Sequence, residues 1–247
     1  MRRSSAEGAS KRGVLLCIGA LLLWGCSTPS TPPVVDRSVS EIPRDGIHEV
    51  RAGETLYAIA FRYSLDFREL ADINDIEEPY VIRAGESLRL RAGARLGLRH
   101  DAGAAPRDAP ARRRTPPQRA VVGLPKSAEL KWTWPAMGNV VTRFGAESKG
   151  IDVDGKVGDP VRAAAAGEVV YAGSGLRGYG NLVIIKHDER TLSAYGHNRT
   201  LLVKEGEQVR GGQAVARMGL RGTRSLVHFE IRRDGKPLDP VSLLPSR

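Results

Sequence analysis

The stretch from residue 131 to residue 247 constrains the fold most, because short apolar runs alternate there with glycine. The runs are rich in β-branched and aromatic residues, and turn signals such as Asp234-Gly235 separate them at short intervals. No helical period longer than two turns interrupts the pattern. The stretch therefore predicts an all-β sandwich or barrel domain, with strands at residues 139–144, 151–153, 160–163, 168–171, 182–187, 192–195, 213–218 and 227–232.

Residues 46–91 carry a second, smaller pattern, which predicts a β-α-α-β module. The first helix has one apolar face at i, i+3, i+4 and i+7 spacing and is capped by Thr55. The second helix begins after Asp66, which has capping-box context, and ends near Asn74. The flanking strands are residues 48–51 and 88–90, and the apolar face comprises Leu56, Ile59, Ala60 and Tyr63.

Residues 1–25 have the pattern of a signal peptide, because basic residues precede an apolar run that is too short to span a bilayer. The run ends at Leu23-Trp24-Gly25-Cys26, which resembles a bacterial lipobox and implies permanent anchoring through lipidated Cys26. The following Ser27 resembles the outer-membrane sorting class of diderm bacteria. The alternative is an ordinary signal peptide with an incidental cysteine.

Two further segments lack apolar periodicity. Residues 26–45 are rich in Ser, Thr and Pro, as in a tether, and residues 92–130 combine Pro, Ala and Arg, which indicates a disordered linker. The net charge of +10 suits an anionic partner such as the cell-wall polymer. Nucleic acid is disfavoured, because no recognition helix or aromatic-interleaved basic patch accompanies the arginines. Both cysteines lie within residues 1–26, so the folded part has no disulfide and no thiolate metal site.

The module at residues 46–91 resembles the LysM peptidoglycan-binding family along its whole length. The resemblance rests on the runs 50–56 and 84–88 and on Ile59-Ala60. It implies a shallow groove for chains that contain N-acetylglucosamine, between the loop before the first helix and the loop after the second. The candidate residues are Gly53, Glu54, Thr55, Leu56, Asn74, Ile76, Tyr80 and Val81, whereas Tyr57 and Tyr63 are expected to pack in the core.

The domain at residues 131–247 resembles the LytM/lysostaphin-type zinc endopeptidases over nearly its full length. The resemblance rests on Gly150-Ile-Asp152, Tyr195-Gly-His197 and the run 226–232, among other landmarks. Active members hold zinc with a histidine four residues before an aspartate, with that aspartate, and with the second histidine of a His-x-His pair. The first histidine of the pair and a further histidine after a tyrosine serve catalysis. Asp152 and His228 match zinc positions, and His197 matches one catalytic position.

The other two positions of this pattern are lost, because Ser148 replaces a zinc histidine and Leu226 replaces a catalytic histidine. A hydrolytic zinc needs three protein ligands and an open position for water, and serine is a poor ligand. Glu147 is one residue away, which on a strand points it to the opposite face. The loss at Leu226 also removes stabilisation of the transition state. We therefore expect no catalysis, and neither a metal nor any other cofactor.

The order of lipobox, LysM module, linker and degenerate LytM-type domain resembles the NlpD/EnvC-type activators of cell-wall amidases. In these activators the vacated cleft binds an N-acetylmuramoyl-L-alanine amidase and displaces its inhibitory helix. The resemblance implies a groove floor and a set of partner contacts, and aromatic and arginine side chains suit an interface. The floor comprises Asp152, His197 and His228, and the contacts are Lys149, Tyr179, Tyr195 and Arg232. Tyr179 and Tyr195 would serve equally well as core residues.

The sequence thus predicts a lipoprotein of the outer membrane that faces the periplasm, gathers at the division site and binds peptidoglycan. It would activate a periplasmic amidase so that septal peptidoglycan is split. Two alternatives stay open at this point. One is a zinc-dependent peptidoglycan endopeptidase with an irregular metal site, and the other is a passive envelope tether that binds only through LysM.

Overall fold

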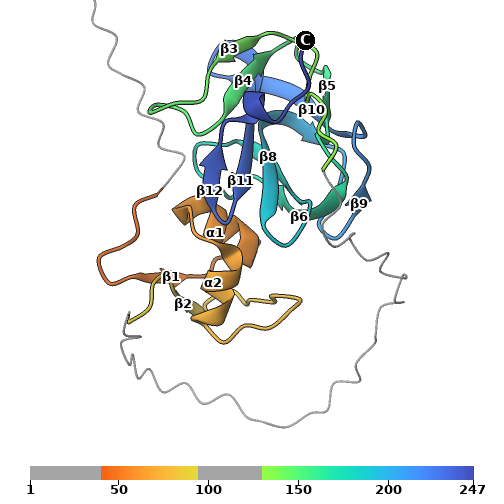
Figure 1. Cartoon of the computed structure of the whole chain (residues 1–247). Coiled ribbons are helices and arrows are strands. Elements are labelled where there is room, and N and C mark those ends of the chain that lie inside the picture. The colour runs from red at the N-terminus through yellow and green to blue at the C-terminus, as the bar shows by residue number, and fades with distance from the viewer. Residues whose placement is uncertain (1–39, 94–129) are drawn as a thin grey trace, which may run out of the picture. The chain divides into compact units, whose positions relative to one another are not determined.

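The computed structural model of the chain describes residues 40–93 and 130–247. The predicted fold class is confirmed, because these residues are mainly β, with two short α-helices in the first range and a large sheet in the second (Figure 1). The predicted signal peptide, Cys26 and most of the tether and linker lie outside the described residues. Within the described ranges, no helix is long and apolar enough to cross a membrane.

The first range contains the predicted β-α-α-β module. Its two short strands pair antiparallel, and both helices lie between them in the sequence. The elements are β1 (Ile47–Glu49), α1 (Leu56–Tyr63), α2 (Phe67–Asp72) and β2 (Ser87–Arg89).

Side chains at the helix ends fix this module. Both predicted N-caps are present, because the side chains of Thr55 and Asp66 accept from backbone N–H groups of the first helical turns. Helix α2 ends at Asp72, two residues before Asn74, so Asn74 belongs to the loop that follows the helix. The Asn74 amide donates to the carbonyl of Arg89 at 2.8 Å and accepts from the N–H of Arg89 at 2.7 Å. Asn74 therefore ties the second loop to the closing strand.

The second range folds into one sheet of ten strands, and all the predicted strands are present. The hydrogen-bonded order is β3-β4-β11-β10-β8-β7-β6-β9, with β12 on β11, β5 on β10 and a further pairing of β11 with β8. The strands are β3 (Val140–Thr142), β4 (Ile151–Asp154), β5 (Pro160–Arg162), β6 (Gly167–Gly173), β7 (Asn181–Lys186), β8 (Thr191–Leu201), β9 (Gln208–Val209), β10 (Ala214–Arg221), β11 (Arg224–Arg233) and β12 (Lys236–Leu238). A 3-10 turn, η1 (Pro240–Ser242), follows. The sequence did not predict the two short strands β9 and β12.

Strand β11 is the centre of this domain, because it pairs with four other strands. Three of its apolar side chains, Val227, Phe229 and Ile231, belong to the core cluster of the domain. Alternate side chains of a strand point to opposite faces, so the residues between these three form a separate row. That row is His228, Glu230 and Arg232, and all three are buried as well.

Candidate functional site: the polar row of strand β11

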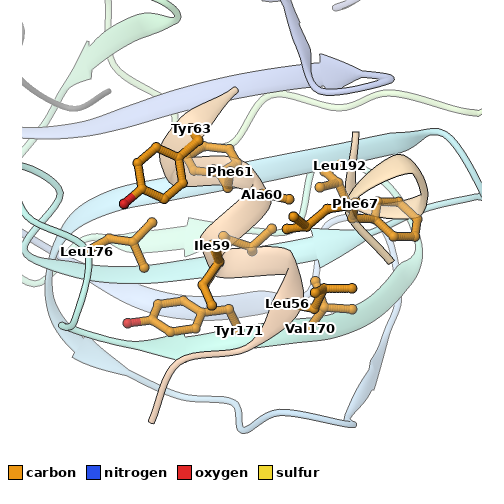
Figure 2. Packing of buried hydrophobic residues seen from close by; sticks show 14 of the residues in the cluster. Leu56, Ile59, Ala60, Phe61, Tyr63, Phe67, Val170, Tyr171, Leu176 and Leu192 are labelled. Carbon is orange, nitrogen blue, oxygen red and sulfur yellow. The ribbon is translucent and has the colours of Figure 1, made fainter. Parts of the chain in front are cut away.

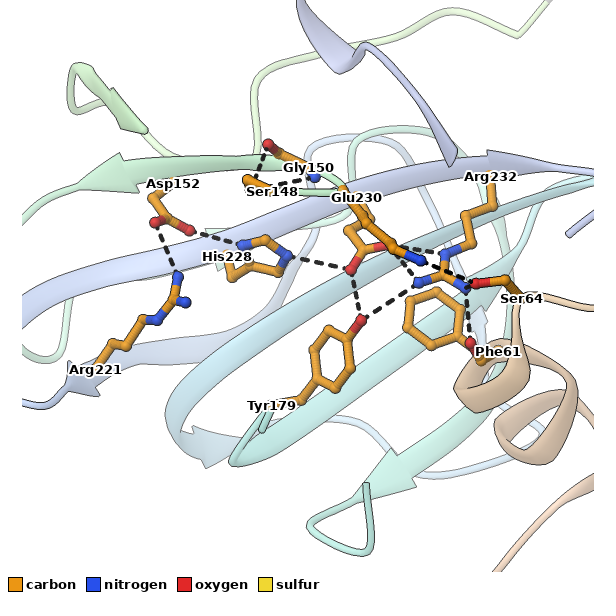
Figure 3. Close-up of polar contacts among 11 residues, drawn as sticks. Phe61, Ser64, Ser148, Gly150, Asp152, Tyr179, Arg221, His228, Glu230 and Arg232 are labelled. Carbon is orange, nitrogen blue, oxygen red and sulfur yellow. Dashed lines mark hydrogen bonds and ion pairs between the residues drawn. The ribbon is translucent and has the colours of Figure 1, made fainter. Parts of the chain in front are cut away.

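The polar row of β11, which is His228, Glu230 and Arg232, forms one continuous chain of ion pairs with Asp152 of β4 (Figure 3). His228 Nδ1 lies 2.7 Å from Asp152 Oδ1, and His228 Nε2 lies 3.2 Å from Glu230 Oε1. Arg232 Nε then donates to Glu230 Oε2 at 2.8 Å. The hydroxyl of Tyr179 donates to Glu230 Oε1 at 2.6 Å. Negative and positive groups alternate along this row, so each buried charge has a partner.

The row shifts the pKa values of its members strongly. Burial alone would lower the pKa of His228, but hydrogen bonds to Asp152 and Glu230 and the charges of these carboxylates raise it to about 9. Burial alone would raise the pKa of Glu230, but the charge of Arg232 and the contact with His228 lower it to about 2. The pKa of Asp152 also lies below its ordinary value, because His228 outweighs the cost of burial. At neutral pH, His228 is therefore an imidazolium between two carboxylates.

The residues present do not fit the zinc that the LytM-type fold implies. A zinc-binding histidine offers an unprotonated ring nitrogen to the metal, whereas both ring nitrogens of His228 are engaged by carboxylates, one by Asp152 at 2.7 Å and the other by Glu230 at 3.2 Å. The second oxygen of Asp152 is also occupied, because Arg221 Nη1 donates to Asp152 Oδ2 at 3.1 Å. The guanidinium thus supplies positive charge where a metal would otherwise do so. Within residues 40–93 and 130–247, no group of three or more His, Cys, Asp or Glu side chains is arranged to hold a metal ion.

The replaced positions of the zinc pattern have structural roles. The Ser148 hydroxyl is buried and donates to the Gly150 carbonyl at 2.9 Å, while the neighbouring Glu147 is exposed. Leu226 is buried at the start of the β11–β4 pairing. His197 is half-buried, in the left-handed backbone region with φ of 60°, and its ring centroid lies 6.3 Å from that of His228. Asp152, His197 and His228 therefore lie close to one another.

The predicted partner contacts fall into two groups. Tyr179 and Arg232 lie together on the polar row, and Arg232 Nη2 donates to the Tyr179 hydroxyl at 3.3 Å. Lys149 is half-buried beside them, with Nζ 3.5 Å from Ser64 Oγ. Tyr195 corrects the prediction, because it is fully buried in the core cluster of the sheet and its hydroxyl accepts from the Ala164 N–H at 2.7 Å. In this fold Tyr195 serves as the core residue that the sequence allowed as the alternative.

The LysM module covers the Arg232 end of the row. Arg232 Nη1 donates to the backbone carbonyl of Phe61 at 2.7 Å, and the guanidinium carbon lies 3.6 Å from the centroid of the Phe61 ring. Phe61 also contacts Tyr179 edge to face, with the ring centroids 5.4 Å apart. Because Phe61 and Glu230 contact its guanidinium, Arg232 is only 1% exposed. Two of the residues predicted to meet a partner, Tyr179 and Arg232, therefore meet helix α1 in this structure.

Some of the candidate glycan-binding residues have structural roles, whereas the others lie in the two predicted loops. Three have structural roles: Leu56 is in the core, Asn74 ties β2 to the second loop, and the Glu54 carboxylate pairs with His48 and Arg62. Burial alone would raise the pKa of Glu54, but these contacts lower it to about 2. The others lie in the two predicted loops, where Gly53 and Val81 are exposed and Thr55, Ile76 and Tyr80 are half-buried. As expected, Tyr63 packs in the core, and Tyr57 packs against the rings of Phe67 and Tyr80.

Two residues of this site, Glu230 and Arg221, were not predicted from the sequence. Glu230 could have been found, because it stands two residues from both His228 and Arg232 and so shares their strand face. Arg221 left no such signal, because it reaches Asp152 of β4 from strand β10, which lies on the other side of β11 in the sheet. The contact of Phe61 with Arg232 joins residues 171 positions apart and likewise has no local signature.

Both parts of the chain match known families. Residues 48–91 match the LysM domain, and residues 146–240 match peptidase family M23. Among solved structures, lysostaphin from Staphylococcus simulans, an antimicrobial peptidase, is similar with 23% identity and a TM-score of 0.40. That match covers 47% of this chain and 53% of lysostaphin.

Relatives match both parts at once. The lipoprotein NlpD/LppB homolog of Pseudomonas aeruginosa is 43% identical, over 95% of this chain and 93% of the relative. The murein hydrolase activator NlpD of Escherichia coli is 34% identical, over 87% of this chain and 73% of the relative. The outer membrane antigenic lipoprotein B of Haemophilus influenzae is also 34% identical, over 80% of this chain and 64% of the relative.

Proposed function

Because the chain belongs to the NlpD/LppB family of lipoproteins, we propose that it is a non-catalytic activator of an N-acetylmuramoyl-L-alanine amidase in the bacterial envelope. Its Escherichia coli relative is named a murein hydrolase activator, which supports a hydrolase as the partner. In this proposal the bond is broken by the amidase. The present chain binds the wall and supplies the surface that activates the partner, so that septal peptidoglycan is hydrolysed and daughter cells separate.

The observation that carries the proposal is the ion-paired row at the place of the metal site. Asp152 is held by His228 and Arg221, and His228 is also held by Glu230, so neither vestigial ligand is available to a metal. A row of fully paired buried charges is rigid but has no group poised to activate water. Its Tyr179 and Arg232 are of the residue types that anchor protein interfaces. The row therefore suits docking better than hydrolysis.

The docking surface in this proposal comprises Lys149, Tyr179 and Arg232, with Asp152, His197 and His228 as its floor. Tyr195 acts from inside the core, where it holds the strands in position. This assignment departs from the expectation for Tyr195 alone, and it adds Glu230, which joins Tyr179 to Arg232.

The rest of the chain places this surface at the wall. The LysM match at residues 48–91 supports binding to peptidoglycan. The lipoprotein relatives support an envelope protein, and we propose that lipidated Cys26 anchors it in the outer membrane with the folded parts in the periplasm, concentrated at the division site. The predicted domain bounds belong to the same proposal, with the tether at residues 26–45, the linker at 92–130 and the C-terminal domain at 131–247.

The test is release of dye from labelled cell-wall sacculi. The full-length chain is added alone, with candidate amidases, and alone with a chelator. We expect no release by the chain alone and a stimulated rate with one of the amidases. Chelator-sensitive release by the chain alone would support the endopeptidase alternative. If the chain binds sacculi but stimulates none of the amidases, the passive tether is correct and the proposal is wrong.

A further inference from the structure

Helix α1 is buried almost all round, although the sequence predicts only one apolar face. Seven of its eight residues are buried. A helix with one apolar stripe leaves its other side to solvent unless another element covers it. The C-terminal domain provides that cover, because one apolar cluster joins the helix to strands β6, β7 and β8 (Figure 2). The cluster includes Leu56, Ile59 and Phe61 from the helix and Val170, Tyr171, Leu176 and Leu192 from the domain.

Polar contacts surround this apolar contact. Arg62 Nη2 donates to the Gly175 carbonyl at 3.1 Å, and Arg68 Nη2 lies 2.9 Å from Asp234 Oδ1. Lys186 lies 3.6 Å from Glu78. These three cations all pair with groups across the contact, and they come from both of its sides. The two parts are thus complementary in charge as well as in apolar surface.

The turn between β11 and β12 approaches the LysM backbone closely. A Cβ at Gly235 would lie 2.3 Å from the carbonyl carbon of Leu65, which is closer than real contacts allow. Only glycine therefore permits this approach, at a position that also has a φ of +71°. The C-terminal domain and the LysM module are therefore in contact through their backbones as well as through their side chains.

We propose that this contact is an autoinhibited state, in which the LysM module blocks the amidase-docking surface and is released when it binds glycan strands of the wall. The proposal rests on the proposed function, and it assigns the regulation of that same surface. The occupant of the docking surface in the resting state is a segment of the same chain, and the releasing ligand is a β-1,4-linked glycan that contains N-acetylglucosamine.

The first argument is overlap on the docking surface. Phe61 lies over Arg232 and against Tyr179, and Ser64 accepts from Lys149 and Arg232. All three docking residues therefore have a partner in or next to helix α1. An amidase cannot contact Arg232 until Phe61 leaves it, because the side chain is 1% exposed.

The second argument is overlap on the glycan-binding loops. Each of the two loops predicted to bind glycan has a contact with the C-terminal domain. In the first loop, Thr55 Oγ1 donates to the Val170 carbonyl at 3.1 Å. In the second, Glu78 pairs with Lys186, whose Nζ also lies 3.4 Å from the Tyr57 hydroxyl. A glycan strand that lies between the loops competes with these contacts.

Because the same contact covers the docking surface and the glycan-binding loops, binding of glycan and binding of the amidase are coupled. A ligand that binds only the open form shifts the population toward it, by a factor set by its preference for that form. Residues 94–129 connect the two parts, and a fully extended chain of this length spans on the order of 100 Å, so the covalent link permits separation. Linked sites of this kind commonly change each other's affinity by about 5-fold to 150-fold.

Lysine labelling measures the opening directly. The full-length chain in detergent is treated with N-hydroxysuccinimide acetate, with and without saturating chito-oligosaccharide, and the acetylation of each lysine is measured by mass spectrometry. Lys186 is buried by the contact, whereas Lys156, Lys204 and Lys236 are exposed and serve as internal controls. We expect the glycan to raise the labelling rate of Lys186 by about tenfold and to leave the controls unchanged. Unchanged labelling of Lys186 at a glycan concentration that saturates binding would overturn the proposal.

The variant Arg68→Glu tests the link to activity. It places a carboxylate against Asp234 and Asp66 at the edge of the contact, outside the docking surface and the glycan loops. Arg44→Glu makes the same charge change at an exposed position just before the LysM module. Stimulation of the amidase is measured on a short muropeptide that lacks glycan strands, with and without chito-oligosaccharide. We expect wild type and Arg44→Glu to need the glycan for full stimulation, and Arg68→Glu to stimulate about tenfold more than wild type without it.

A second variant, Lys186→Ala in the C-terminal domain, removes the contacts of Lys186 with Glu78 and Tyr57 of the LysM module. It should raise stimulation without glycan as Arg68→Glu does. It therefore keeps the test valid if Arg68→Glu folds poorly. Stimulation that is present but indifferent to glycan and to both variants would overturn the regulation and leave the proposed function standing. If no amidase is stimulated in any arm, while Lys186 still becomes accessible with glycan, the proposed function fails and the regulation fails with it.

Discussion

The guanidinium of Arg232 lies over the ring of Phe61, 3.6 Å from its centroid, and donates to the Phe61 carbonyl at 2.7 Å. Through this pair, a helix of the LysM module is joined to the buried ion pairs of strand β11. The same strand, β11, carries His228 at one end of the polar row and Arg232 at the other. In the proposed function, the LysM module and the amidase-docking surface thus share a single network of contacts.

Arg232 should be costly to remove by itself, because Glu230 is fully buried and would lose its main counter-charge. We expect Arg232→Met to destabilise the chain by about 3–5 kcal/mol. The double variant Glu230→Gln/Arg232→Met removes both charges and should cost less than the single one. Urea unfolding of the full chain measures both. A single variant that costs no more than the double variant would mean that Glu230 does not depend on Arg232.

The two tyrosines should separate core from surface. Tyr195→Phe deletes the acceptor of the buried Ala164 N–H, which should cost about 1–3 kcal/mol of stability and leave amidase stimulation by the folded protein unchanged. Tyr179→Phe deletes the 2.6 Å hydrogen bond to Glu230 on the docking surface, and we expect it to lower stimulation at 20 °C, where both variants are folded. Loss of stimulation in Tyr195→Phe under these conditions would return Tyr195 to the partner contacts.

These two residues also show how far the sequence could be read. Local patterns predicted the helices, their caps Thr55 and Asp66, and every strand of more than three residues, because periodicity and capping are encoded by near neighbours. Motif positions correctly brought Asp152, His197 and His228 together. Motifs could not tell that Tyr195 faces the core while Tyr179 faces the row, since both are tyrosines next to glycine in a β-rich domain.

The long-range contacts could not be predicted from the sequence, because they join residues that are far apart in the chain. Arg221 meets Asp152, and Arg232 meets Phe61, only after strands and modules distant in sequence have packed. The sequence offers many arginines with the same local context. Only the completed fold determines which of them replaces the metal charge and which lies beneath helix α1.

The protonation of His228 should be visible by NMR. Because the pKa of His228 is raised to about 9, both ring nitrogens should carry protons at pH 7.5. The sign follows from linkage: the folded state binds this proton more tightly than the unfolded state, so its stabilisation is present below pH ~6.5 and is lost as pH rises toward 9. His187 provides an internal contrast, because burial lowers its pKa to about 4 and its ring should stay neutral at pH 5.5. A neutral His228 ring at pH 7.5 would contradict the ion-paired row.

Restoring a zinc site should require two changes rather than one. Ser148→His returns the missing ligand type, but Arg221 still holds Asp152 and His228 is still charged. We expect Ser148→His alone to bind zinc at least ten times more weakly than Ser148→His/Arg221→Ala, measured by calorimetry at pH 7.5. Equal affinities would show that Arg221 does not compete with a metal for Asp152.

The most direct test of the central claim is to identify which bond is broken in sacculi. The full-length chain, an amidase and their mixture are incubated with sacculi, and mass spectrometry follows two products: peptides with a newly freed N-terminal L-alanine, and cleaved peptide cross-links. The account predicts that the mixture frees L-alanine termini at least tenfold faster than the amidase alone, while cross-link cleavage stays at background in every arm. Cross-link cleavage by the chain alone would contradict it.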